Sequence, residues 1–382
     1  MTRAPAAGAG TSTAQAPGAT AERVLRGMYR RSGAWLLDRL GLVPAGGRPE
    51  LAGHVPVEIG TAFAVGPDFE RPVAGRSVVV GGACLTHCDA RPERVRAEFV
   101  ADTVQPLLLA AWAGVPCVLF LPVGEEMIVS DPSIGRQDWR RFGDGMEAFV
   151  RALAAAVPGG RPPVVVRTDA AETSAVLDRA VERSGDALAG LDLEDLYTVR
   201  PARAARRPPG PARLRQYHRS IVTYLPEVVS ELAPGLDVRH VVVAENLHQA
   251  KAVRAAEAVA EAVGAPGRID HLAHVPSPSV TGTGRMARAE DHSTLFCLDA
   301  PVVRAEKLAR MPSSVRRFWA ACFPEGPRPP HGPGAPQAEG DAVRLAALFD
   351  GWHRTLARAT GTPAAPAAAA TSDRTPPEGV TR

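Results

Sequence analysis

Long apolar runs, aromatic residues and lysine are all scarce in this sequence, and each shortage narrows the class of protein. No run of about 18 apolar residues occurs, so a membrane-spanning helix is not expected. The first residues carry no apolar stretch of signal-peptide type. Aromatic residues make up 5% of the 382 residues, and the formal net charge is only +3, which does not by itself indicate a nucleic-acid partner. These features predict a soluble, cytoplasmic protein without a membrane partner.

Cysteine is also scarce, with five residues in the whole chain. An odd number without a secretory signal argues against a disulfide framework, so we expect free thiols. Cys84, His87 and Cys88 fall in the stretch CLTHCD, but no second cluster completes a zinc site, and no metal centre is predicted. A thiol beside an imidazole can also be an activated nucleophile, which leaves Cys84 with a second interpretation.

Proline, alanine and glycine are concentrated at the ends of the chain. Residues 1–21 and 362–382 contain too little apolar surface to offset the entropy of ordering, and we expect disordered tails there. Residues 324–340 have the same character and form a predicted linker. Between the tails we expect a catalytic-type domain at 22–312 and a reduced helical region at 313–361.

The middle of the chain alternates between strand-like and helix-like segments. RSVVVGGA and PCVLFLP are short apolar runs typical of buried parallel strands, and PERVRAEFVADTVQPLLLAAWAG between them has helical periodicity. The later segments repeat this order, with expected helices at 139–157, 220–233, 246–264 and 341–359 and expected strands at 162–168 and 237–245. The sequence therefore predicts a Rossmann-type α/β fold, in which an open, mostly parallel sheet has helices on both faces and binds ligands at the carboxyl ends of its strands.

One long segment resembles a known family. VVVAENLHQAKAVRAAEAVAEAVG is followed by HVPSPSVTGTG, by RMARA and by EDHSTLFCLDAP, which has the spacing Ser-x-x-Phe-x-x-Asp-x-Pro. In this order the segments resemble class I aminoacyl-tRNA synthetases of the tryptophanyl/tyrosyl branch, closest to the archaeal and eukaryotic tryptophanyl type, over residues 24–312. The resemblance implies a ligase that activates an amino acid with ATP and Mg²⁺, with tRNA as a partner and a homodimeric assembly.

The two ATP-binding motifs of that family are both altered in this chain. The position of the HIGH motif falls on RVRAEF, residues 94–99, which contains neither histidine nor glycine. The resemblance leaves Arg94 or Arg96 to supply a cation to the phosphates, with Arg96 taken as the catalytic residue, and the glycine has no substitute. In the KMSKS position, Arg285 and Arg288 replace the lysines that stabilise pyrophosphate, and alanines replace both serines. Gly284 and Met286 complete the implied nucleotide-binding loop.

The same resemblance implies a substrate pocket on both halves of the sheet. Small residues that end the first strand let a ligand approach the backbone, and a carboxylate after the second strand holds an amino group or an indole N–H. The residues assigned to substrate binding are Gly81, Gly82, Cys84, Glu125, Glu126, Tyr224, Glu245 and Gln249. Plainer interpretations stay open: a strand-to-loop glycine pair, a solvated acidic turn, core packing of Tyr224 and helix capping by Asn246.

Arginine is unusually dense in residues 199–219, VRPARAARRPPGPARLRQYHR. Such density can bind RNA phosphates, with an affinity that falls steeply as salt rises. A solvated insertion explains the composition equally well.

Two further functions fit the same fold. A cyclodipeptide-synthase-type enzyme uses charged tRNA as acyl donor and places its nucleophile just after the first strand, where Cys84 stands. A catalytically inactive synthetase paralogue would bind an amino acid or a protein partner and regulate, which the loss of both motif cores favours. The ATP-dependent ligase remains the leading hypothesis.

Overall fold

The computed structural model describes residues 63–65, 69–70, 72–82, 90–123, 136–157, 161–191, 210–245, 249–274, 277, 279–281, 291–313, 315–316, 319 and 337–362. The predicted N-terminal tail, residues 324–336 of the linker and residues 363–382 lie outside this set. Within it, no helix combines the length and the apolar character needed to cross a bilayer.

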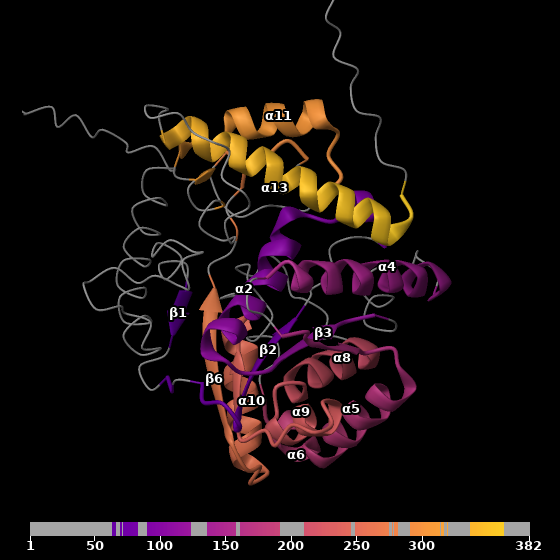
Figure 1. The fold of residues 1–382 in the computed structure, drawn as a ribbon. Helices are drawn as coiled ribbons and strands as arrows, with labels where there is room; N and C mark the ends of the chain where they lie inside the picture. The colour runs from indigo at the N-terminus through magenta and orange to yellow at the C-terminus, as the bar shows by residue number, and fades with distance from the viewer. Residues whose placement is uncertain are drawn as a thin grey trace, which may run out of the picture.

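A six-stranded sheet forms the centre of the described structure, in the order β1-β6-β5-β2-β3-β4 (Figure 1). Neighbouring strands from β6 to β4 run parallel, and β1 pairs with β6 antiparallel at one edge. The strands are β1 (Phe63–Val65), β2 (Ser77–Gly82), β3 (Cys117–Leu121), β4 (Val164–Arg167), β5 (His240–Val243) and β6 (Arg268–His274). The predicted Rossmann-type α/β fold is confirmed.

The chain reverses its direction across the sheet between β2 and β5. It runs outward from β2 to β3 and β4, then returns to the other side of β2 to form β5 and β6. β2 and β5 are therefore neighbours, and Val80 of β2 pairs with Val243 of β5. In open α/β sheets a ligand binds outside the carboxyl ends of the strands at such a switch point. The topology alone thus indicates a ligand site at the residues that follow Val80 and Val243.

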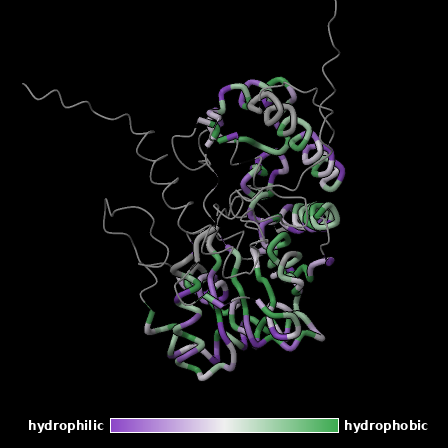
Figure 2. Tube along the Cα trace, turned by 60° about the vertical axis from the view of Figure 1, so that its left-hand side comes forward, coloured by the Kyte–Doolittle hydropathy of each residue, from purple (hydrophilic) through white to green (hydrophobic). Residues whose placement is uncertain are grey.

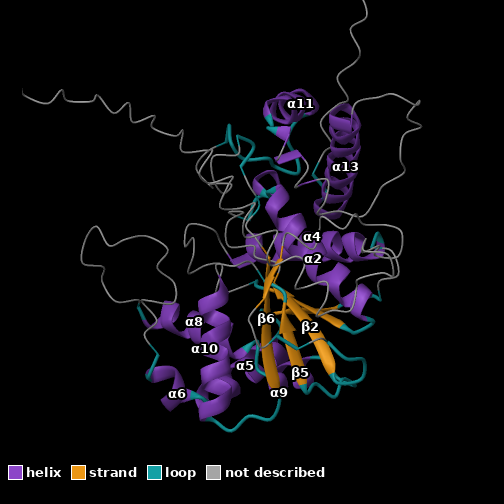
Figure 3. Cartoon of the chain, turned by 90° about the vertical axis from the view of Figure 1, so that its left-hand side faces the viewer, coloured by secondary structure: helices purple, strands orange, loops and turns teal. Residues whose placement is uncertain are grey.

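Helices cover both faces of the sheet, and the central strands β2, β3 and β5 are buried on both sides, as their continuous apolar runs predict (Figure 2). Val79 packs into the core of the first face and Val80 into that of the second. The first face carries α2 (Ala97–Ala113), α4 (Arg136–Ala155), α11 (Pro301–Arg310) and α13 (Gln337–Thr360). The second face carries α5 (Ala171–Arg183), α6 (Gly185–Ala189), α8 (Pro211–Val222), α9 (Pro226–Leu232) and α10 (Ala250–Ala262). Figure 3 shows α11 and α13 beyond α2 and α4, away from α8 and α10.

Among the helices that differ from their predicted bounds, α8, α9 and α13 do so for local reasons. The predicted helix at 220–233 is two helices, because Leu225 precedes a proline and takes an extended conformation with ψ 132°. α8 begins at Pro211, so residues 211–219 of the predicted arginine-rich insertion are helical. α13 starts four residues before the predicted 341, at Gln337, and packs on α4, where Gly145 leaves room for Thr360. At Gly264, the positive φ of 64° confirms the predicted cap of α10.

Candidate functional site

The switch point brings Gly82 and Glu245 together at the carboxyl edge of the sheet. Gly82 ends β2, and Glu245 follows β5 with 7% of its surface exposed. A Cβ atom at Gly82 would collide with Oε1 of Glu245, so the carboxylate lies directly over the glycine. A buried carboxylate above bare backbone, at the place where this topology binds ligands, is the starting point of the candidate site.

Gly81 is adjacent to Gly82 but has a different structural role. Its Cβ position lies 2.5 Å from Cγ of Pro106 in α2 and 3.2 Å from Cδ2 of Leu119 in β3. Gly81 therefore allows α2 to pack closely on the first face, whereas Gly82 makes space for Glu245 on the second. The sequence assigned both glycines to substrate binding, and the structure gives them different neighbours.

His271 is a neighbour of Glu245 that the sequence did not single out. It lies in β6, and its Nε2 is 3.3 Å from the carbonyl oxygen of Glu245. Burial lowers the pKa of His271 to about 4, so the ring is neutral at physiological pH. Because a carbonyl oxygen only accepts, Nε2–H of this neutral ring donates to it. The sequence offered no signal for His271, because no strand was predicted at residues 268–274.

Gln249 lies at the same edge, as the residue that precedes the first turn of α10. It is half-buried, and the backbone N–H groups of the α10 N-terminus follow it. Such an N-terminus favours a carboxylate or phosphate group. Three of the predicted substrate residues, Gly82, Glu245 and Gln249, thus fall along the β2–β5 switch point.

The segment in the position of the HIGH motif pairs with residues 295–297, which belong to the Ser-x-x-Phe-x-x-Asp-x-Pro segment after the KMSKS position. Cys297 N donates to Val95 O at 2.8 Å, and Ala97 N donates to Leu295 O at 2.9 Å. Arg96 and Phe296 form an isolated antiparallel bridge between these bonds. This pairing explains why the predicted helix 92–114 is interrupted: Pro92–Arg94 is a 3₁₀ turn, labelled η2, and α2 begins only at Ala97. The N-terminus of α2 therefore contacts the segment that follows residues 282–290 in the sequence.

Two arginines near this pairing have different environments. The guanidinium of Arg96 is 2.8 Å from Oε2 of Glu98, and the two side chains are 9% and 2% exposed. Arg94 is more accessible; its Nη1 is 2.8 Å from Oδ1 of the exposed Asp291, and its Cζ lies 4.7 Å from the centroid of the Phe296 ring. Arg96, the cation expected from the sequence, is neutralised by Glu98, and Arg94 is the more exposed positive charge.

The remaining predicted site residues divide between the core and the undescribed segments. Tyr224 is buried in the hydrophobic cluster of the second face, so its assignment to substrate binding stays a prediction. Outside the described residues lie Cys84, Glu125, Glu126, Gly284, Arg285, Met286 and Arg288, with His87, Cys88 and Asn246. Within the described part of the chain, no group of three or more His, Cys, Asp or Glu side chains is placed to hold a metal ion. Cys117 and Cys297 are buried free thiols, and burial raises the pKa of Cys117.

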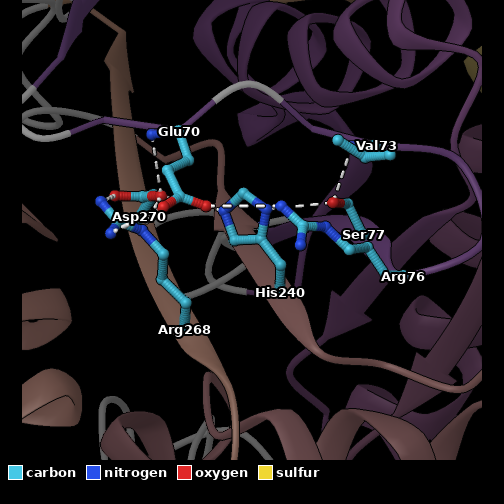
Figure 4. A network of polar contacts seen from close by, with 7 residues as sticks. All are labelled: Glu70, Val73, Arg76, Ser77, His240, Arg268 and Asp270. Carbon is cyan, nitrogen blue, oxygen red and sulfur yellow. Dashed lines mark hydrogen bonds and ion pairs between the residues drawn. The ribbon is translucent and has the colours of Figure 1, made fainter.

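A second polar cluster lies at the opposite, amino edge of the sheet (Figure 4). Ser77 Oγ is 3.0 Å from His240 Nδ1, and His240 Nε2 is 2.9 Å from Asp270 Oδ2. The residue types are those of a nucleophilic triad, but Ser77 is 4% exposed and its hydroxyl accepts a hydrogen bond from Val73 N at 2.8 Å. A substrate cannot reach a buried hydroxyl in this position, so the cluster connects β2, β5 and β6 rather than catalysing a reaction.

The amino-edge cluster predicts a pH dependence of stability. Burial raises the pKa of Asp270, but hydrogen bonds from His240, Arg268 and Glu70 N outweigh burial and lower it overall. A carboxyl with a lowered folded-state pKa stabilises the fold above its unfolded pKa and loses that contribution as pH falls through the folded pKa. We expect the stability difference between wild type and Asp270→Asn, measured by urea unfolding, to shrink between about pH 5 and pH 2. A difference that stays constant over this range would contradict the assignment, and Asp237→Asn, in an exposed pair with Arg239, is the control.

Comparison with known proteins identifies the fold. No protein-family model matches the chain, and no curated protein matches its sequence. Solved structures of tryptophanyl-tRNA synthetases share its fold, which is therefore like that of the class I aminoacyl-tRNA synthetases of the tryptophanyl/tyrosyl branch. Among solved structures, tryptophanyl-tRNA synthetase of Aeropyrum pernix is 15% identical, with 90% of this chain and 96% of that chain covered and a TM-score of 0.56.

Two eukaryotic structures agree with this result. Tryptophanyl-tRNA synthetase of Encephalitozoon cuniculi, bound to tryptophan, is 11% identical over 88% of this chain and 92% of that chain, with a TM-score of 0.54. The tryptophanyl-tRNA synthetase homolog of Entamoeba histolytica is 8% identical over 88% and 89%, with a TM-score of 0.53. The chain therefore has the tryptophanyl-tRNA-synthetase-like fold, and similarity at this level of identity concerns the fold alone.

Proposed function

We propose that the chain binds an aromatic or related amino acid, or its adenylate, at the β2–β5 switch point and activates the amino acid with ATP and Mg²⁺. The observation that carries this proposal is the backbone pairing of residues 95–97 with residues 295–297. It joins the segment in the HIGH position, at the N-terminus of α2, to the segment that follows the KMSKS position in the sequence. Because α2 follows β2, that N-terminus lies at the same edge of the sheet as Gly82 and Glu245.

The residues present fit a nucleotide and an amino acid. Arg94 offers a partly exposed cation to an anionic group, and Glu245 offers a carboxylate to an ammonium group. When bound, ATP supplies the α-phosphate that the amino-acid carboxylate attacks, and Mg²⁺ is held by the phosphates. The proposed contacts to the departing pyrophosphate are Arg285 and Arg288. Gly284 precedes Arg285, and Met286 lies between the two arginines.

The other predicted residues complete the proposed site. Glu98 fixes the guanidinium of Arg96 at the start of α2. Gly82 leaves the space that Glu245 occupies, and Gln249 orients the amino-acid carboxylate at the N-terminus of α10. Cys84, Glu125, Glu126 and Tyr224 are proposed to line the side-chain pocket. tRNA as a partner and a homodimer are part of the same proposal.

Pyrophosphate exchange with a panel of amino acids tests the proposal. We expect exchange with at least one aromatic or related amino acid and a loss of about 10- to 100-fold in kcat/KM for that amino acid in Glu245→Gln, because a hydrogen bond to a charged group is removed. Glu261→Gln, on the exposed side of α10, is the matched control and is expected to behave as wild type. Absence of exchange with every amino acid would exclude the ATP-dependent activity.

The Arg96–Glu98 ion pair favours a second candidate, transfer of an acyl group from charged tRNA without ATP. It occupies the α2 N-terminus where the family contacts phosphates, and a neutralised arginine is poorly suited to that task. In this reaction Cys84 would be the nucleophile, as in the cyclodipeptide synthases that the sequence also resembles. Incubation with charged tRNA compares wild type with Cys84→Ala, and equal acyl transfer by both would remove Cys84 from the mechanism.

A further inference from the structure

We propose that the C-terminal helix α13 is a positioning element of the site, and that Arg304 of α11 is the residue through which it acts. The catalytic consequence rests on the proposed function above, but the structural consequence does not. A series of polar contacts carries the inference, and it runs from the half-exposed Asp350 of α13 through the buried Arg304 and Asp299 to the backbone pairing at the N-terminus of α2.

Asp299 is the hub of this series of polar contacts. Its carboxylate accepts from Nζ of Lys307 at 3.0 and 2.9 Å and from Phe296 N at 2.9 Å. Its carbonyl oxygen accepts from Nη1 of Arg304 at 3.3 Å. Lys307 and Arg304 both lie on α11 and are 6% and 5% exposed. The segment that contains Phe296 is thus fixed to α11 by buried charges, rather than by surface pairs of little energetic weight.

α13 contacts the hub in two ways. Asp350 of α13 binds the guanidinium of Arg304, which places one arginine between the C-terminal helix and the carbonyl of Asp299. The backbone of Asp299 lies near His353, one turn later on α13, and acts to raise the pKa of this histidine, although burial lowers it overall. The aromatic side chains Phe349 and Trp352 pack in the core of the first face beside these polar groups. Replacement of Asp350 alone, with α13 in place, would leave Arg304 buried without its carboxylate.

From Asp299 the contacts continue to the site. The ring of Phe296 lies under two cations, with Arg94 Cζ at 4.7 Å and Lys307 Nζ at 5.1 Å from its centroid. The neighbours of Phe296, Leu295 and Cys297, form backbone hydrogen bonds with Ala97 and Val95, and these hydrogen bonds hold the N-terminus of α2. A displacement of Asp299 therefore moves the aromatic surface under Arg94 and the strand pairing together, which is how α13 would affect binding of an anionic ligand without touching it.

The experiment compares Asp350→Ala with Glu306→Ala, which removes an exposed partner of Arg310 on α11 (3.7 Å, both side chains 61% exposed). We expect amide hydrogen exchange at Ala97 and Cys297 to become faster by about tenfold or more in Asp350→Ala and to stay unchanged in the control. Unchanged exchange at both amides in Asp350→Ala would overturn the proposal. This readout needs no activity, so it remains decisive even if the proposed function fails.

A second variant separates positioning from general stability. Arg304→Met/Asp350→Leu replaces the ion pair by apolar side chains and is expected to regain folding stability. Because methionine cannot donate to Asp299 O, exchange at Ala97 and Cys297 should remain fast. In an enzyme active in pyrophosphate exchange, kcat/KM for ATP should fall about tenfold in both variants, with KM for the amino acid unchanged. Wild-type exchange rates in the double variant would show that α13 stabilises the fold only.

Discussion

Replacing Asp299 by alanine is expected to lower the free energy of unfolding by about 3–5 kcal/mol, because it leaves the buried ammonium of Lys307 without its carboxylate. The Nζ atom of Lys307 binds both carboxylate oxygens of Asp299, and the two side chains are 8% and 10% exposed. The substitution also removes the acceptor of Phe296 N, a buried backbone donor. Urea unfolding of wild type and variant at neutral pH measures the effect.

Two companion variants define the cause. Asp299→Asn keeps an oxygen for Phe296 N but loses the negative charge, so it should fall between wild type and alanine. Asp237→Ala breaks an exposed pair whose side chains are 72% and 65% exposed, and is expected to change stability by no more than about 0.5 kcal/mol. A loss in Asp299→Ala as small as in Asp237→Ala would mean that Lys307 finds solvent or another partner without cost.

The parallel strands β2, β3 and β5 were predictable because they are buried on both faces, whereas the parallel strand β6 was not predicted. RSVVVGGA and PCVLFLP contain β2 and β3, and the apolar part of DVRHVVVAE is β5. β1 was missed, since it is a three-residue antiparallel strand that exists through its pairing with β6, some 200 residues later in the chain. The late start of α2 has the same origin, because residues 95–97 are held extended by residues 295–297. Local periodicity carries no information about partners so far away.

The candidate site was likewise predictable from the sequence only where its residues follow predicted strands. Gly82, Glu245 and Gln249 could be placed from strand order, because residues that follow parallel strands meet at one edge. The neutralisation of Arg96 by Glu98 could not be predicted, because the ion pair spans a junction between an extended residue and a helix. Arg304 and Lys307 had the appearance of ordinary surface cations on an amphipathic helix, and they are buried only because α13 and Asp299 cover them.

The two adjacent glycines at the end of β2 are expected to separate folding from function. Gly81→Ala should lower the free energy of unfolding by about 1–3 kcal/mol, because the new methyl group meets Pro106, a rigid ring inside α2, and the helix must shift on the sheet. Gly82→Ala meets the carboxylate of Glu245, which ends a flexible side chain and can rotate away. The second variant should therefore keep most of its stability and lose amino-acid binding, because Glu245 leaves its position.

Urea unfolding and calorimetric titration with the amino acid that supports exchange measure the two effects separately. Equal destabilisation by both substitutions would show that Glu245 cannot move and that Gly82 is a packing residue like Gly81. The double variant Gly82→Ala/Glu245→Asp supplies the decisive comparison, because the shorter acid withdraws its carboxylate from the added methyl group. It is expected to recover part of the binding that Gly82→Ala loses. Such a recovery follows only if the carboxylate itself, held over the end of β2, contacts the ligand.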